Sequence, residues 1–127
     1  MKMAVIYYSV TNNTKNMGEQ IVKGMNSVEG VDAKSFPIED VDVKFVKEAK
    51  CVVFGSPIYA AHITGQMMNY LLAEAGKLGL AGKLAGAYTT AQYVHGGAEL
   101  GIREILDHCM VMGPGRFFFP FFFFIWI

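Results

Sequence analysis

The chain has 127 residues, of which 53% are apolar, and its 11 basic side chains balance its 11 acidic ones. This length and composition fit one domain with a sizeable core. A net charge of zero argues against nucleic-acid and anionic-membrane partners, because it provides no long-range attraction for them. Cys51 and Cys109 match no metal-ligand spacing and are expected to be reduced. Without an initial apolar stretch long enough for a signal peptide, the chain is expected to be cytoplasmic.

Apolar runs and amphipathic segments alternate along the chain. The apolar runs predict strands at residues 3–8, 31–36, 51–55 and 84–89, with a fifth strand beginning at residues 110–112. Helical spacing of apolar residues predicts helices at residues 15–26, 41–50, 66–76 and 98–108. This order predicts an α/β fold, in which helices cover both faces of a parallel sheet. Ligands of such sheets bind beyond the carboxyl ends of the strands.

A polar segment without glycine, SVTNNT at residues 9–14, separates the first predicted strand from the first predicted helix. The free N–H groups of a helix amino end favour an anion at this place. Side chains of Ser9, Thr11, Asn12 and Thr14 can add further donors. The lysine and glycines of a Walker A motif are missing, so neutral groups would hold a phosphate. A helix cap without any ligand explains the same residues equally well.

The segment SPIYAAHITG, residues 56–65, follows the third predicted strand. Pro57 stiffens the exit from that strand, and Tyr59 presents an aromatic ring on which a flat ligand such as a flavin can stack. A half-buried loop tyrosine is the competing interpretation, and it is favoured for Tyr59 taken alone. His62 is expected to be an exposed polar residue at a helix start.

A third segment, TAQYVHGG at residues 90–97, follows the fourth predicted strand. Gly96 and Gly97 allow the backbone to approach a ligand closely. Thr89, Thr90 and Gln92 carry donors and acceptors suited to a pyrimidine-like edge. His95 either donates to a substrate oxygen or only tethers the loop. The three segments follow parallel strands and are expected to meet at one rim of the sheet.

Taken together, the three segments resemble the flavodoxin superfamily. Residues 9–14 are similar to its phosphate loop, [ST]-x-T-G-x-T, with Asn12 in place of the usual glycine. Because asparagine tolerates a positive φ, the turn is expected to be kept. The runs GSPIY and HGGAE, at residues 55–59 and 95–99, resemble the tryptophan-repressor-binding-protein-like NAD(P)H:quinone oxidoreductases. Similarity extends over residues 3–113.

The resemblance implies a doubly wound sheet of five parallel strands in the order 2-1-3-4-5, noncovalently bound FMN, and NAD(P)H as the electron donor. The implied activity is two-electron transfer to a quinone-like acceptor. His95 is the candidate catalytic residue, as a hydrogen-bond donor to the acceptor or to a flavin carbonyl. The implied cofactor-binding residues are Ser9, Thr11, Asn12, Asn13, Thr14, Pro57, Ile58, Tyr59, Thr89, Thr90, Ala91, Gln92, Tyr93, Gly96 and Gly97.

Two other functions stay open on the same fold. A one-electron carrier of the flavodoxin type would be acidic and would have a glycine beside the flavin, whereas this chain is neutral and residues 58–61 contain none. A flavin-free binding module is the second alternative, which Asn12 and the unusual end of the chain keep open.

The chain ends in FFFPFFFFIWI, residues 117–127, where the superfamily would complete its fifth strand and add a last helix. The domain is therefore expected to occupy residues 1–116, without that helix. This segment is about half as long as a membrane span. Two hypotheses account for it: a non-native end, or a segment that covers an apolar sheet face, its own or a neighbour's, and produces a homo-oligomer.

Overall fold

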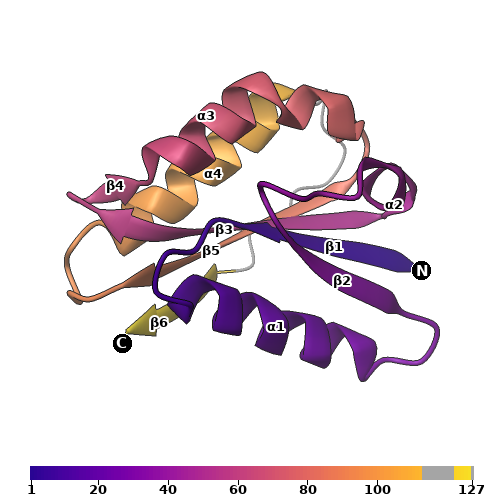
Figure 1. Cartoon of the computed structure of the whole chain (residues 1–127), viewed down its shortest axis with the longest axis horizontal. Coiled ribbons are helices and arrows are strands. Elements are labelled where there is room, and N and C mark those ends of the chain that lie inside the picture. Colours follow the sequence, from indigo (N-terminus) through magenta and orange to yellow (C-terminus); the bar gives the residue numbers. More distant parts are fainter. Residues whose placement is uncertain (113–121, 127) are drawn as a thin grey trace.

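A computed structural model describes residues 1–112 and 122–126 and places five parallel strands in one twisted sheet (Figure 1). The spatial order is β2-β1-β3-β5-β6, which confirms the predicted order 2-1-3-4-5 when the parallel strands are counted along the chain. These strands are β1 (Lys2–Tyr7), β2 (Asp32–Pro37), β3 (Cys51–Tyr59), β5 (Leu84–Ala91) and β6 (Phe122–Trp126). The short β4 (His62–Ile63) turns back and pairs antiparallel with the end of β3.

Helices lie on both faces of the sheet, as the alternation of strands and helices predicts. α1 (Asn13–Asn26) packs on one face, and α3 (Gly65–Ala73) and α4 (Ala98–Met112) lie side by side on the other (Figure 1). The short α2 (Val43–Glu48) and the 3-10 helix η1 (Ala75–Leu78) belong to the same face as α3 and α4. The carboxyl ends of the parallel strands consequently meet at a rim bordered by the amino ends of α1 and α4.

Two apolar clusters fill the two sides of the sheet. Side chains alternate along β1, so Ala4 and Ile6 join the cluster beneath α2, α3 and α4, while Val5 and Tyr7 join the cluster beneath α1. β1 is therefore apolar on both faces, which explains its unbroken apolar sequence. On the α1 side, a groove of about 600 Å³ adjoins the smaller cluster. Its apolar lining includes Met3, Met17, Ile21, Met25, Val53 and Leu84.

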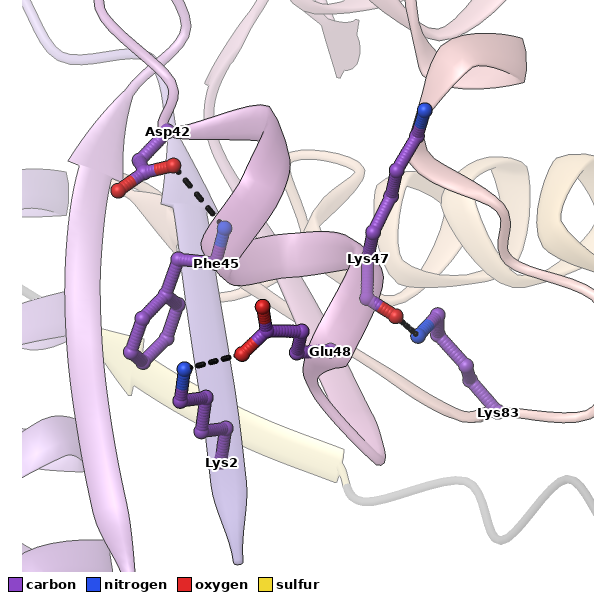
Figure 2. Close-up of polar contacts among 6 residues, drawn as sticks. All are labelled: Lys2, Asp42, Phe45, Lys47, Glu48 and Lys83. Carbon is purple, nitrogen blue, oxygen red and sulfur yellow. Dashed lines mark hydrogen bonds and ion pairs between the residues drawn. The ribbon is translucent and has the colours of Figure 1, made fainter.

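Polar contacts fix both ends of the short helix α2 (Figure 2). Asp42 Oδ1 accepts a hydrogen bond from the Phe45 N–H at 2.9 Å and caps the amino end. Lys83 Nζ donates to the Lys47 carbonyl oxygen at 2.7 Å and also to the carbonyl oxygen of Ala49. An ion pair between Lys2 and Glu48 joins the helix to β1. A helix of this length depends on such contacts because its own hydrogen bonds are few.

One predicted strand was wrong. Residues 110–112 continue α4, whose buried residues Ile102, Ile105 and Cys109 recur at helical spacing. A short apolar run such as MVM fits either a strand or a helix, so its period alone does not decide. The fifth strand is β6 instead, within the segment expected to be an aberrant tail. Residues 117–121 and 127 of that segment, and the boundary expected at residue 116, lie outside the described residues.

Two strands are longer than the apolar runs predict. β3 was predicted to end at residue 55 but continues to Tyr59. β5 was predicted to end at residue 89 but continues to Ala91. Parallel pairing of Ser56 with Thr89 and of Pro57 with Thr90 carries both strands into segments expected to be loops. The helix expected at residues 66–76 is divided into α3 and η1. The lengthened strands fix the positions of the rim residues more firmly than free loops would.

Candidate functional site

A cleft of about 580 Å³ opens at the carboxyl ends of β1, β3 and β5. All three polar segments contribute to it, as expected from the topology. Its lining residues are Val10, Thr11, Asn13, Thr14, Pro57, Ile58, Tyr59, Ala60, Ala61, Thr90, Ala91, Gln92, Tyr93 and Gly96. None of these described residues carries a charge, and the volume lies within the usual range of small-ligand sites, about 300–1,000 Å³.

The first wall of the cleft is the turn that leads from β1 into α1. Asn12 is the residue before the helix and has φ 68° and ψ −4°, so the turn has the left-handed conformation expected of it. The Lys15 N–H donates a hydrogen bond to Ser9 Oγ at 3.3 Å. Among the described residues, the backbone N–H groups of residues 11–14 donate no hydrogen bond. They form a cluster of available donors at a helix amino end, which suits an anion.

A buried hydrogen-bonded group joins this turn to the third wall. The hydroxyl oxygens of Thr14 and Thr90 lie 2.8 Å apart, and one of them donates to the other. The accepting hydroxyl keeps its own proton for a further acceptor. Tyr88 donates its phenol hydrogen to the Thr14 carbonyl oxygen at 2.9 Å, and burial raises the pKa of this phenol far above its ordinary range. Tyr88 therefore stays protonated and keeps donating to the α1 turn.

The second wall is a hairpin formed by the end of β3, a two-residue turn and β4. Tyr59 is half exposed, and Pro57 and Ile58 lie before it along the cleft. Ala60 and Ala61 form the turn with φ values of 51° and 66°. A hairpin turn of this kind normally contains asparagine or glycine, so the two alanines gave no sequence signal for it. Ala60, Ala61 and Val10 are the lining residues that sequence reasoning missed.

The third wall is formed by the end of β5 and the residues that follow it. Thr90, Ala91, Gln92, Tyr93 and Gly96 all line the cleft, as expected. Tyr93 is 70% exposed, so its ring is available to a ligand at the cleft entrance. Tyr59 and Tyr93 thus supply aromatic surface to two walls of the cleft.

Five of the expected site residues do not line the cleft. Ser9 and Asn12 determine the shape of the first turn instead. Ser9 Oγ accepts a hydrogen bond from the Lys15 N–H, and Asn12 has a left-handed backbone conformation. Thr89 is fully buried and donates to the Ala98 carbonyl oxygen at 3.0 Å, which joins β5 to the start of α4. Gly97 faces the hairpin turn, since a Cβ there would lie 2.2 Å from the Ala61 carbonyl oxygen. His95 is exposed outside the lining set.

The described part of the chain holds neither a metal-binding group of side chains nor a membrane-spanning helix. In residues 1–112 and 122–126, no group of three or more histidine, cysteine or acidic side chains is arranged to hold a metal ion. Cys51 and Cys109 are both buried, and burial raises the pKa of each thiol. No described helix has the length and apolarity needed to cross a membrane.

The strand order, the flanking helices and the cleft at the strand ends define a flavodoxin-like α/β protein. Residues 1–123 match the family described as NADPH-dependent FMN reductase, and the chain belongs to that family. The resemblance to the flavodoxin superfamily, and within it to quinone oxidoreductases, is thereby confirmed. The family and the quinone dehydrogenase relatives support an FMN-binding oxidoreductase.

Two relatives illustrate the range of names among similar sequences. A flavodoxin from Clostridium saccharobutylicum is 33% identical over 89% of this chain and 70% of its own length. An NAD(P)H dehydrogenase (quinone) from Geotalea daltonii is 30% identical over 88% of this chain and 70% of its own length. A carrier-type name and an enzyme-type name therefore both occur at similar percentage identity and coverage.

Solved structures share the fold at lower identity. An archaeal flavodoxin superimposes with a TM-score of 0.81 and 24% identity, over 97% of this chain and 84% of that one. A flavodoxin, WrbA-like protein from Agrobacterium tumefaciens gives 0.72 and 18% identity, over 88% and 74% of the two chains. These similarities establish the architecture of the sheet and its helices.

Proposed function

We propose that the cleft binds FMN noncovalently and that the protein transfers two electrons from NAD(P)H to a quinone-like acceptor. The observation that carries this proposal is the meeting of an uncharged, donor-rich helix amino end with two aromatic-bearing walls in one cleft. Family membership supports FMN as the ligand of that cleft. The donor and the acceptor are inferred from the name of the Geotalea relative.

The residues of the first wall suit the phosphate of FMN. Free N–H groups of residues 11–14 and the hydroxyl of Thr11 or Thr14 offer several neutral donors to its oxygens. The α1 dipole adds a favourable field at this position. No lysine or arginine lines the cleft within the described residues, so affinity depends on geometry rather than on a point charge.

The other two walls suit the isoalloxazine ring. The hairpin residues 57–59 and residues 90–93, at the end of β5 and just after it, line two walls of the cleft. Tyr59 or Tyr93 offers stacking area, and Thr90 and Gln92 offer polar groups for the pyrimidine edge. When bound, FMN supplies the capacity to accept hydride from a nicotinamide and to pass two electrons on. The protein's own contribution is to orient the reactants and exclude water from the ring.

His95 is proposed as a donor to the acceptor or to a flavin carbonyl oxygen. It follows Tyr93 by two residues and is exposed beside the third wall. His95→Gln keeps a side-chain donor, whereas His95→Ala removes it. Loss of quinone reduction in the alanine variant, with FMN affinity unchanged, supports the proposed role. Equal turnover in both variants and the wild type would assign His95 to the surface only.

A one-electron carrier is the second candidate, and the similarity to the Clostridium flavodoxin favours it. It would bind FMN in the same cleft but would oxidise NAD(P)H negligibly. The neutral charge and the absence of glycine in the turn at residues 60–61 favour the enzyme instead. The flavin-free module remains the interpretation if no FMN binds.

We propose a soluble cytoplasmic location for the protein. We also propose that it forms a homo-oligomer through the apolar segment at residues 117–127. The segment contains β6, which pairs with β5, so truncation would also disturb the sheet. The mass of the intact chain in solution therefore tests the oligomer. A mass of two or more chains is expected, and a monomer contradicts the proposal.

The deciding experiment is titration of the purified apoprotein with FMN. The fluorescence and visible absorption of FMN report its binding. Riboflavin, which lacks the phosphate, is the matched control ligand. Saturable quenching of FMN and much weaker binding of riboflavin are expected, because the first wall recognises the phosphate. NADH and NADPH oxidation with a soluble benzoquinone then separates enzyme from carrier. Absence of FMN binding would leave the segment at residues 9–14 as a helix cap alone.

A further inference from the structure

The hairpin wall of the cleft has a backbone that its own sequence does not favour. Tyr59 pairs with His62, and Ile58 pairs with Ile63, so Ala60 and Ala61 alone form the turn. Both alanines have positive φ values, 51° and 66°. Such a turn suits glycine or asparagine, since a Cβ is crowded in the left-handed region. Contacts from elsewhere must therefore hold this turn in place.

Glu104, on α4, makes two contacts with the returning strand of this hairpin. Its Oε1 lies 2.7 Å from His62 Nδ1, and its Oε2 accepts a hydrogen bond from the Ile63 N–H at 3.1 Å. The two carboxylate oxygens thus bind two successive residues of β4. The Glu104 side chain is 27% exposed and His62 is 69% exposed, so the contact lies at the partly shielded edge of the fold. His62 is exposed, as expected, but it lies in β4 and is paired.

This close contact is possible because two glycines face the hairpin, Gly97 directly before α4 and Gly101 within it. A Cβ on Gly97 would lie 2.2 Å from the Ala61 carbonyl oxygen, and one on Gly101 would lie 2.4 Å from Ile58 Cδ1. The amino-terminal part of α4 and β4 are neighbours in the fold (Figure 1). α4 therefore supports the hairpin along its length, with Glu104 making the polar contacts.

We infer that Glu104 is a positioning residue for the cofactor cleft, which it acts on through the β3–β4 hairpin. Glu104 lies outside the cleft, but Ile58, Tyr59, Ala60 and Ala61 all line it. By holding β4, the carboxylate keeps the two alanines in the left-handed turn. It thereby fixes the position of Tyr59 in the second wall of the cleft. This inference rests on the proposed function in one respect, because FMN is taken as the ligand that the wall contacts.

The test compares FMN affinity in three variants, with Asp107→Ala as the matched control. Asp107 is a carboxylate on the same helix, in an exposed pair with Arg103 rather than with a hairpin residue. Glu104→Ala is expected to weaken FMN binding about tenfold, as loss of a charge-assisted contact allows. Glu104→Gln keeps one side-chain acceptor and is expected to retain most of the affinity. Asp107→Ala should match the wild type.

The decisive comparison is between Glu104→Ala and the same variant with the backbone strain of the turn removed. Placing Ala60→Gly and Ala61→Gly in the Glu104→Ala background removes the conformational cost that the carboxylate offsets. FMN affinity is then expected to recover to within about threefold of the wild type. A role of Glu104 in overall stability alone would show no such recovery. If Glu104→Ala fails to fold, the Glu104→Gln and glycine variants decide.

An apoprotein measurement separates this inference from the proposed function. Hydrogen exchange of the Ile63 N–H should accelerate in Glu104→Ala and stay unchanged in Asp107→Ala, whether or not FMN binds. Wild-type protein without FMN affinity would overturn the proposed function, and the Ile63 exchange would still report on the contact. Unchanged Ile63 exchange, wild-type FMN affinity in Glu104→Ala, or failure of the glycines to restore binding would each overturn the inference.

Discussion

The phenol oxygen of Tyr88, in β5, donates a hydrogen bond to the carbonyl oxygen of Thr14, in the first turn of α1, at 2.9 Å. Seventy-four residues separate the two along the chain. Tyr88 is fully buried beneath α1, where its side chain crosses the space above Gly55 and reaches Gly18. This contact fixes the amino end of α1 relative to the strand ends, and hence the first wall of the cleft relative to the third.

Tyr88→Phe removes this hydrogen bond while keeping the ring. The expected loss of unfolding free energy is about 1 kcal/mol, the usual net value of one buried hydrogen bond. FMN affinity should fall a few-fold as well, because the α1 turn loses a fixed position. Urea unfolding and FMN titration measure the two effects. Tyr93→Phe, at an exposed tyrosine, is the control and should leave the unfolding free energy unchanged.

Gly55 in β3 provides the space that the Tyr88 ring occupies. A Cβ at residue 55 would lie 2.0 Å from Tyr88 Cζ, so one of the two side chains would have to move. Gly55→Ala is therefore expected to destabilise the fold by roughly 1–3 kcal/mol or more, the cost of overpacking a core. Gly24→Ala, in α1, meets no atom within 4 Å and is expected to stabilise by about 1 kcal/mol through helix propensity. Similar unfolding free energies for the two variants would contradict this account.

The strands and the cleft were largely predictable because they follow from local patterns. An apolar run without alternation indicates a strand buried on both faces, and β1 is such a strand. Polar segments after parallel strands must then meet at one rim, as residues 11, 57 and 90 do. Neither step needs knowledge of a contact between distant side chains.

The details that the sequence did not predict depend on contacts between distant residues. Thr89 was expected in the site, but its hydroxyl joins β5 to the Ala98 carbonyl oxygen. Gly97 was expected to admit a ligand, but it admits the backbone of Ala61. The left-handed turn at Ala60 carries no residue that signals one. In each case a hydroxyl, a glycine or an alanine has several compatible roles, and only its tertiary partner selects one.

Asn12 should tolerate glycine but not a β-branched residue. Its φ of 68° lies in the left-handed region, where a β-branched side chain is strongly disfavoured. Asn12→Gly is expected to keep the unfolding free energy and FMN affinity, whereas Asn12→Val should cost roughly 1–2 kcal/mol. Asn16→Val is the control within α1, where φ is negative, and it should cost only a few tenths of a kcal/mol. Equal effects at residues 12 and 16 would argue against a strained turn.

Alkaline pH should destabilise the protein through buried groups that resist ionisation. Burial, with a smaller effect from Glu74, raises the pKa of Tyr70 from 10.0 to about 12, and burial raises the pKa of Cys109 from 9.0 to about 12. Both groups ionise more readily in the unfolded chain, so the unfolded state binds fewer protons above pH 9. The unfolding free energy should therefore be unaffected by these groups below pH 9 and should fall between pH 9 and pH 12.

Urea unfolding across this pH range, with tyrosinate absorbance followed in parallel, measures the effect. Tyr70→Phe removes one of the two groups and should make the fall shallower above pH 10. Cys109→Ala should do so from pH 9 upward, and Tyr93→Phe, at an exposed residue, should leave the slope as it is. A pH dependence that is the same in all three variants would show that other groups cause the alkaline loss. A shallower slope in the two buried-site variants alone would assign a part of the loss to Tyr70 and Cys109, beside the buried Tyr88 and Cys51.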